Sequence, residues 1–338
     1  MAEHLSLRGF VNAHSHTFQR ALRGAAVGDD FWAWREAMLA LAERQTPDVV
    51  REQYAETYRE MRAAGYTAVG EFHYLGFPEA RAALDAAADA GIAIVLLLAA
   101  YARGGLPRFR RPSVADYLRD VEHLLADGFA VGVAPHSVRA CPRPWLEEVG
   151  RYAERERLVL HVHADEQTRE VEECLAEHGL RPIELLAAAG CVGPHTTVVH
   201  ATHADDRELD LIAEAGARVC VCPTTEANLA DGFVPAGRLR ERAISICIGS
   251  DSNVRIDPLE ELRELEVIAR RMNGRRNVFP PATLLRFGAD EGAAALGLEA
   301  WPETAIDLGH RSLRGIPPGD TLAALIFGSA ADVVVPPR

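Results

Sequence analysis

The stretch GFVNAHSH, residues 9–16, carries two histidines one residue apart at the end of an apolar run. Alternate residues of a β-strand point to the same side, so His14 and His16 can both reach one ion from a strand end. A pair of hydrogen-bonded structural histidines would account for this short stretch equally well. The rest of the sequence must therefore decide between a metal site and a structural pair.

Further apolar runs follow the first one along the chain, and amphipathic segments separate them. The segments 47–65 and 113–128 both end on glycine, and the first opens with Pro47, as helices do. Buried strands alternating with helices are typical of parallel strands covered by helices. Their number favours an α/β fold of the (β/α)8 TIM-barrel type over a doubly wound sheet. Because no linker or repeat interrupts the pattern, we expect a single domain over residues 1–338. The eight runs are 9–14, 66–75, 92–101, 130–136, 158–164, 196–203, 218–223 and 244–251.

Composition limits the partners that this chain can have. The net charge of -13 argues against nucleic acid or an anionic membrane surface, although a local group of arginines can still bind a small anion. The longest apolar run, 92–101, is too short to span a bilayer, and the N-terminus lacks signal-peptide features. We therefore expect a cytoplasmic protein with a small anionic substrate. The alternating Cys220 and Cys222 are expected to be buried small hydrophobic residues rather than a metal site.

Polar residues end six of the eight predicted strands. In a barrel of this type the carboxyl ends of the strands converge on one face, which carries the functional site. Neutral imidazoles and a carboxylate are ligands that suit Zn²⁺. Polar groups at so many strand ends favour the metal site over the structural pair. The residues at these ends are His14, His16, Glu71, His73, Tyr74, His136, His161, His163, Glu166, His200, His203 and Asp251.

The motifs at these ends resemble those of the amidohydrolase superfamily, and HADE (163–166) resembles its deaminase branch. The resemblance implies one divalent metal ion, with Zn²⁺ expected and Fe²⁺ or Mn²⁺ left open. It implies a proton shuttle at Glu166 and assigns His200 and Asp251 to the attacking water. Branches of the superfamily that bind two metal ions usually carry a bridging lysine at the end of the fourth strand. Here that strand ends in His136 with no lysine nearby, which favours one metal ion over two. The implied metal ligands are His14, His16, His163 and Asp251.

A finer resemblance is to the formimidoylglutamate deiminases of histidine degradation. It implies hydrolysis of N-formimino-L-glutamate to N-formyl-L-glutamate and ammonia. Two arginines suit the two carboxylates of that substrate, because a guanidinium binds a carboxylate with a planar fork. The two arginines that the resemblance implies are Arg35 and Arg139, and Arg169 or Arg255 could take the place of either one. The motifs are HSHTFQRALRG (14–24), FWAWRE (31–36), EFHYLG (71–76), APHSVRA (134–140) and CPTTEANLADG (222–232). The implied substrate-binding residues are Gln19, Arg35, Tyr74, His136 and Arg139.

One departure and two alternatives accompany this interpretation. Relatives usually carry a small β-sandwich domain, which we expect to be absent or vestigial here, with residues 1–8 and 299–338 as its remnants; a homodimer stays open. The first alternative is another deaminase of the same branch that acts on a purine or related ring, which would need aromatic stacking rather than two arginines. The second is a catalytically inactive barrel that serves as a binding protein. The complete set of site residues argues against the second alternative.

Overall fold

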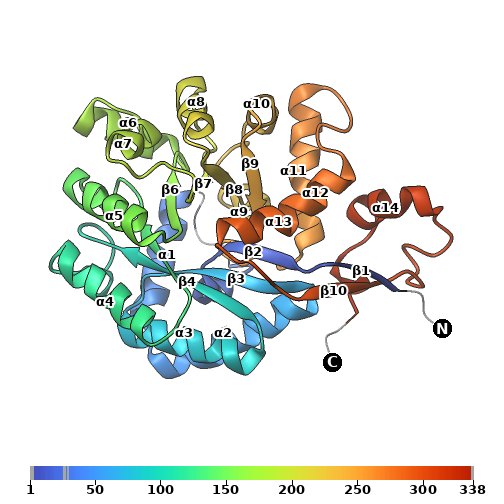
Figure 1. The fold of residues 1–338 in the computed structure, drawn as a ribbon, viewed down its shortest axis with the longest axis horizontal. Helices are drawn as coiled ribbons and strands as arrows, with labels where there is room; N and C mark the ends of the chain where they lie inside the picture. The colour runs from blue at the N-terminus through green and yellow to red at the C-terminus, as the bar shows by residue number, and fades with distance from the viewer. Residues whose placement is uncertain (1–3, 26–27, 29, 336–338) are drawn as a thin grey trace.

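The computed structural model describes residues 4–25, 28 and 30–335. Its centre is an eight-stranded parallel sheet in which sequential strands are neighbours, from β2 to β9. Seven of the strands lie within the predicted apolar runs and β2 extends one residue beyond its run, to Ser15, which confirms the predicted (β/α)8 barrel (Figure 1). The strands are β2 (Phe10–Ser15), β3 (Tyr66–His73), β4 (Ala93–Ala100), β5 (Val131–Pro135), β6 (Leu160–Ala164), β7 (Thr196–His200), β8 (Arg218–Val221) and β9 (Ser245–Ile248).

The barrel closes between its first strand and the residues that follow its last one. Ser15 and Asp251 form an isolated parallel bridge. The amide of His16 donates to the Asp251 carbonyl at 2.7 Å, and the amide of Asp251 donates to the His14 carbonyl at 3.0 Å. This seam brings the two histidines of β2 beside a carboxylate from the other end of the barrel.

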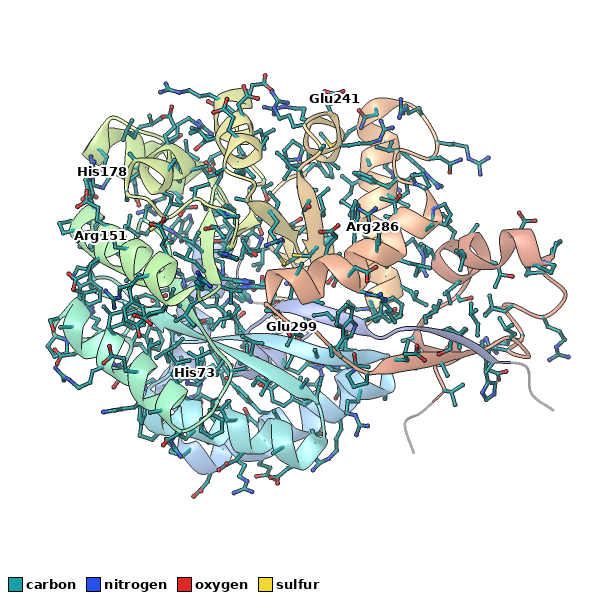
Figure 2. The ribbon with its side chains drawn as sticks, viewed as in Figure 1. His73, Arg151, His178, Glu241, Arg286 and Glu299 are labelled. Carbon is teal, nitrogen blue, oxygen red and sulfur yellow. The ribbon has the colours of Figure 1, made fainter. Side chains whose placement is uncertain are left out.

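Helices surround the strands, and their charged side chains face outward. Arg151, Glu241 and Arg286 are exposed on the outer helices (Figure 2). The inner strands are buried, as expected for parallel strands covered by helices. The helices are α1 (Phe31–Glu43), α2 (Pro47–Ala63), α3 (Phe77–Ala90), α4 (Val114–Ala126), α5 (Arg143–Glu156), α6 (Thr168–His178), α7 (Pro182–Ala188), α8 (Asp206–Glu214), α9 (Pro223–Leu229), α10 (Ala236–Glu241), α11 (Pro258–Asn273), α12 (Pro281–Gly288), α13 (Asp290–Ala295) and α14 (Thr321–Gly328).

Local chemistry explains where the helices begin and end. Asp30 begins α1 by accepting the Ala33 amide at 2.8 Å, and Ser113 begins α4 by accepting the Asp116 amide at 3.1 Å. Such side-chain caps satisfy amides that have no partner inside the helix. Gly91 ends α3 with a φ of 70°, a left-handed conformation that glycine adopts without steric cost. The helices are therefore bounded by residues of the kind that sequence rules predict.

A second, two-stranded sheet lies at the side of the barrel. Strand β1 (His4–Arg8) pairs antiparallel with β10 (Glu303–Asp307), close to α14 in Figure 1. Both strands fall in the segments 1–8 and 299–338, of which residues 1–3 and 336–338 lie outside the described residues. The buried side chain of Ile306 joins this sheet to the main core. The idea that these segments are remnants of a larger domain stays a prediction.

All six cysteines are buried free thiols. Cys220 and Cys222 lie in a small apolar cluster with Cys247. Among the helices that the structure describes, none combines the length and apolar character that crossing a membrane requires.

Candidate active site

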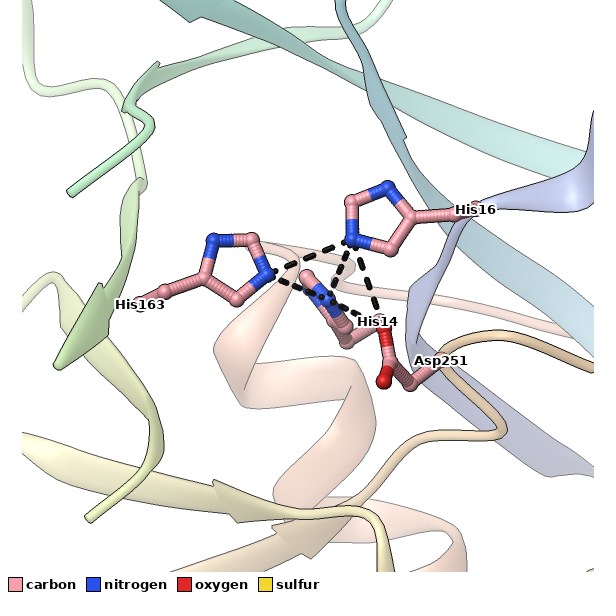
Figure 3. Close-up of side chains that lie close together, drawn as sticks. All are labelled: His14, His16, His163 and Asp251. Carbon is pink, nitrogen blue, oxygen red and sulfur yellow. Dashed lines mark hydrogen bonds and ion pairs between the residues drawn. The ribbon is translucent and has the colours of Figure 1, made fainter. Parts of the chain in front are cut away.

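Four side chains from three parts of the barrel converge at its mouth (Figure 3). His14 and His16 come from β2, His163 from β6, and Asp251 from the seam after β9. The Nε2 atoms of the three histidines lie 3.1–3.2 Å from one another. The Asp251 Oδ1 lies 3.3 Å from Nε2 of both His14 and His16. The structure thus brings together all four residues that the sequence assigned to a metal.

The protonation of these rings suits a metal. The Nδ1 of His16 lies 2.9 Å from the Phe72 carbonyl, and that of His163 lies 2.9 Å from the His136 carbonyl. A carbonyl can only accept, so each Nδ1 carries the hydrogen and each Nε2 of a neutral ring presents a lone pair. Burial lowers the pKa of His14 to about 3 and also lowers the pKa of His16 and His163. The rings are therefore held neutral.

The spacing of the four atoms also fits a metal. Nitrogen lone pairs and a carboxylate at this distance repel one another unless a cation lies among them. Ligand atoms about 2.0–2.1 Å from a tetrahedral Zn²⁺ are roughly 3.3 Å apart, close to the separations found here. The donor set therefore fits a single divalent metal ion in both chemistry and geometry.

Strained backbone surrounds this site. His200, Ala201 and Asp251 have φ values of 75°, 52° and 43°, and Asp165 has 55°. Residues other than glycine occupy this region rarely, at a cost of about 1–3 kcal/mol each, and such residues cluster at functional sites. All four of these residues lie at or just after the carboxyl end of a strand. The strain thus accumulates at the face where barrel enzymes carry their chemistry.

Two candidate acid–base groups, Glu166 and His200, lie beside the four ligands. The Glu166 Oε1 is 3.7 Å from the His200 Nε2, and the Glu226 Oε1 is 3.3 Å from the His200 Nδ1. Burial opposes the charged form of His200, but the Glu226 hydrogen bond and the charges of Glu166 and Asp251 outweigh burial. Together they raise the pKa of His200 to about 10. A divalent cation among the ligands would lower this pKa again, because it repels an imidazolium.

The five residues predicted to bind substrate share one cavity with three of the ligands, His16, His163 and Asp251. Gln19, Arg35, Tyr74, His136 and Arg139 line it together with Glu166. Side chains that the sequence analysis did not assign to the site add an apolar wall, formed by Phe31, Trp34, Met38, Leu39, Tyr101 and Leu229.

The side chains predicted to bind substrate differ in whether their polar atoms already have partners within the protein. Gln19 donates from Nε2 to the Tyr74 hydroxyl at 2.8 Å, and its buried Oε1 has no hydrogen-bond partner among the described residues. Arg35 is partly exposed, with its nearest carboxylate on Glu36 at 3.5 Å. Both can accept a new polar partner. Arg169 and Arg255, the two alternatives, are exposed and pair with Glu173 and Glu260 outside the cavity lining.

Arg139 has acidic partners that the sequence did not reveal. Its Nη2 lies 3.0 Å from the Glu166 Oε2, and its Nε lies 3.3 Å from the Glu170 Oε1. Glu170 is fully buried, and its Oε2 also accepts the Glu166 amide at 3.2 Å. Arg139 therefore joins the predicted substrate pocket to the predicted proton shuttle.

The remaining histidines at the strand ends make structural contacts. The Nε2 of His73 lies 3.1 Å from the Gly76 carbonyl, and that of His161 lies 2.9 Å from the Ala295 carbonyl. Sequence reasoning missed Glu170 and Glu226, both buried at the site. For Glu226 a signal was present, because TTE (224–226) directly follows the seventh predicted strand, where the barrel topology places functional residues.

Comparisons with known proteins agree with this geometry. Residues 7–300 match the model of the amidohydrolase family. Formimidoylglutamate deiminase of Pseudomonas aeruginosa is 38% identical over 300 residues, which cover 80% of this chain and 66% of the relative. A 5-methylthioadenosine/S-adenosylhomocysteine deaminase of Haloarcula marismortui is 31% identical, covering 88% of this chain and 69% of the relative.

Solved structures give the same result. An amidohydrolase from Brucella melitensis superposes with a TM-score of 0.83 at 31% identity, covering 97% of this chain and 84% of that one. An adenosine deaminase from Xanthomonas campestris with bound zinc superposes with a TM-score of 0.89 at 25% identity, covering 97% of this chain and 77% of that one. The present chain thus spans about two thirds of the length of the curated relatives, 66% and 69%.

Proposed function

The chain belongs to the amidohydrolase family and is a hydrolase that acts on carbon–nitrogen bonds; from this premise we propose that it deaminates N-formimino-L-glutamate. The products would be N-formyl-L-glutamate and ammonia. The observation that carries the proposal is that Arg35 and Arg139 line the same cavity as three of the four ligand residues, His16, His163 and Asp251. A substrate with two carboxylates and a formimino group needs both features at once.

The metal would be held by His14, His16, His163 and Asp251. When bound, a divalent ion would supply Lewis-acid activation and would lower the pKa of water towards about 7. Zn²⁺ is the ion proposed, since three neutral imidazoles and one carboxylate suit it.

The side chains around the ion would move the protons. Asp251 and the His200 Nε2 are placed to accept the proton that water loses as its oxygen attacks the formimino carbon. Glu166, with Oε1 3.7 Å from the His200 Nε2, would deliver a proton to the departing nitrogen. The bond between the formimino carbon and this nitrogen then breaks and ammonia leaves. The hydroxyl that came from water gives its second proton back to Glu166 as the formyl carbonyl forms, and the first proton leaves Asp251 and His200 with ammonia or to solvent.

Substrate recognition would divide between the two arginines. Arg35, from α1, is free to bind one carboxylate with two parallel hydrogen bonds. Arg139 is fixed by the buried Glu170 and would bind the second carboxylate through its remaining N–H groups. Because Arg139 also contacts Glu166, the bound carboxylate would lie next to the proposed proton shuttle. Gln19 and Tyr74 would orient the rest of the substrate.

A second candidate function is deamination of a 5′-modified adenosine. The apolar wall with Phe31, Trp34 and Tyr101 could stack on a purine ring. The Haloarcula marismortui relative, at 31% identity, is a deaminase of this kind. Such an enzyme would not need Arg35.

An ammonia-release assay on a panel of substrates separates these functions. The panel is N-formimino-L-glutamate, its diamide, N-formimino-L-aspartate, 5′-methylthioadenosine and guanine. We expect the highest kcat/KM with N-formimino-L-glutamate and a much lower value with its diamide. Faster ammonia release from either purine would overturn the proposal.

Replacing the arginines tests how the substrate is held. Deleting one partner of a buried charge pair costs about 2–5 kcal/mol, so Arg35→Met should raise KM for the diacid steeply and change the diamide little. Arg139→Met should lower kcat as well, because Glu166 and Glu170 lose their cation. Arg255→Met, an exposed arginine outside the cavity lining, is the matched control and should resemble the parent. A parallel decline with diacid and diamide would show that the arginines are structural.

A further inference from the structure

The buried carboxylate of Glu226 contacts the Nδ1 of His200, whereas the Nε2 of the same ring lies near Glu166, which lines the catalytic cavity. We propose that Glu226 is a positioning residue that fixes the tautomer of His200, so that a bare Nε2 faces the reacting water. This inference rests on the proposed function for the role of His200, but the contact itself is independent of the substrate.

The contact geometry defines the tautomer. The Glu226 Oε1 lies 3.3 Å from the His200 Nδ1 and accepts the Cys222 amide at 2.9 Å. Glu226 is 1% exposed, in helix α9 directly after β8. An ionised carboxylate can only accept, so the hydrogen of a neutral His200 must reside on Nδ1. The Nε2 atom then carries a lone pair, and it lies 3.7 Å from the Glu166 Oε1.

The partner of Nδ1 distinguishes His200 from the predicted metal ligands. His16 and His163 each donate from Nδ1 to a backbone carbonyl, which fixes the tautomer without adding charge. A carboxylate behind the ring also stabilises the imidazolium that forms when Nε2 takes a proton, as it does in Ser-His-Asp triads. Among these three rings, His200 alone has the environment of a proton acceptor.

The backbone indicates that the ring needs a fixed partner. His200 and the next residue, Ala201, both have left-handed φ values, 75° and 52°. Strained conformations persist only where the surrounding structure holds them. The Glu226 carboxylate lies closer to the His200 ring, at 3.3 Å, than the Glu166 carboxylate, at 3.7 Å, and it reaches the ring from a different strand–helix unit. Glu226 therefore secures an orientation that the local backbone alone does not favour.

A competing explanation is that Glu226 only caps the start of α9. Glu261 provides the matched control, because it is also fully buried and accepts the Thr224 amide at 3.0 Å at the start of the same helix. The contacts of the Glu261 carboxylate do not include His200. A role confined to helix capping predicts the same consequences for Glu226→Gln and Glu261→Gln.

The first test is the tautomer itself, read by ¹⁵N NMR of the zinc-loaded protein, with the His200 signals assigned from their loss in His200→Asn. We expect a protonated Nδ1 and a bare Nε2 in the parent. Glu226→Gln should give a mixture of tautomers, Glu226→Asp should restore the parent pattern, and Glu261→Gln should leave it unchanged. A parent with hydrogen on Nε2 would overturn the proposal, even if no Glu226 variant folds.

The second test is kinetic. Loss of a partner that orients a histidine typically costs about 10- to 100-fold, so kcat of Glu226→Gln should fall by that factor with KM nearly constant. In the His200→Asn background the same substitution should lower kcat little further, because the effects of two residues that act as a unit are not additive. An equal loss in both backgrounds would reduce Glu226 to a structural role. A parent that does not deaminate N-formimino-L-glutamate would refute the proposed function but leave the tautomer test standing.

Discussion

His163 is held from two sides, and both contacts favour metal binding. Its Nδ1 donates to the His136 carbonyl, and its Nε2 faces His14 and His16. We expect His163→Ala to lose most of the bound metal together with activity, as measured by metal analysis per chain and ammonia release. The parent should bind about one ion per chain.

The control for this substitution lies two residues earlier on the same strand. The Nε2 of His161 donates to the Ala295 carbonyl at 2.9 Å, a contact with the barrel wall rather than with the ligand set. His161→Ala should keep its metal even if it loses stability. Full metal retention in His163→Ala, or two tightly bound ions in the parent, would show that the ligand assignment is wrong.

Glu166 offers a test of proton transfer separate from metal binding. Glu166→Gln has nearly the same shape but cannot deliver a proton, and general acid–base groups contribute about 10²–10⁴-fold to rate. We expect kcat to fall by that factor while the metal content stays at the parental level. Glu173→Gln, an exposed glutamate on α6, should turn over normally. A near-normal kcat in Glu166→Gln would remove this residue from the mechanism.

At the scale of elements, the sequence predicted the barrel strands well and the second sheet poorly. Each barrel strand is a continuous apolar run bounded by polar residues. This pattern can be recognised in the sequence without any knowledge of tertiary contacts. Strands β1 and β10 are partly exposed, and their pairing depends on residues from opposite ends of the chain. Nothing local in either segment specifies its partner.

The same limit explains which site residues were missed. The ligands end strands, so the barrel topology alone brought them together. Glu170 and Glu226 lie on α6 and α9, where glutamates usually face solvent. Burial of Glu170 follows from Arg139, which arrives from a loop after β5. A single sequence does not disclose such a partner.

The second sheet makes an energetic prediction of its own. Ile306 on β10 is fully buried in the main core, so Ile306→Ala should lower the free energy of unfolding by about 2–5 kcal/mol. Urea unfolding measures this, and ammonia release by the folded variant should stay near the parental level. Ser6→Ala, on the exposed face of the paired strand, should change stability by less than about 0.5 kcal/mol. Equal stability of Ile306→Ala and the parent would show that the sheet is not coupled to the core.

At the scale of the whole molecule, the ligands connect parts of the barrel that are distant in sequence. An ion bound only by the folded state stabilises it by about 4 kcal/mol when present at roughly 1,000 times its Kd. Chelation should therefore lower the unfolding temperature, and zinc should restore it. Amide hydrogen exchange should accelerate most at His16 and Asp251, with Val133 on β5 as the internal control. Uniform acceleration across the barrel would contradict a local effect at the seam.

The position of the seam also fixes an order of assembly. His14 and His16 leave the ribosome with the first barrel strand, His163 follows with β6, and Asp251 emerges only after β9. Until the segment after β9 has emerged, a nascent chain lacks the contacts between β2 and that segment. These contacts bring the carboxylate to the imidazoles. The four ligands can therefore bind one ion together only after Asp251 has been synthesised and the seam between β2 and the segment after β9 has formed.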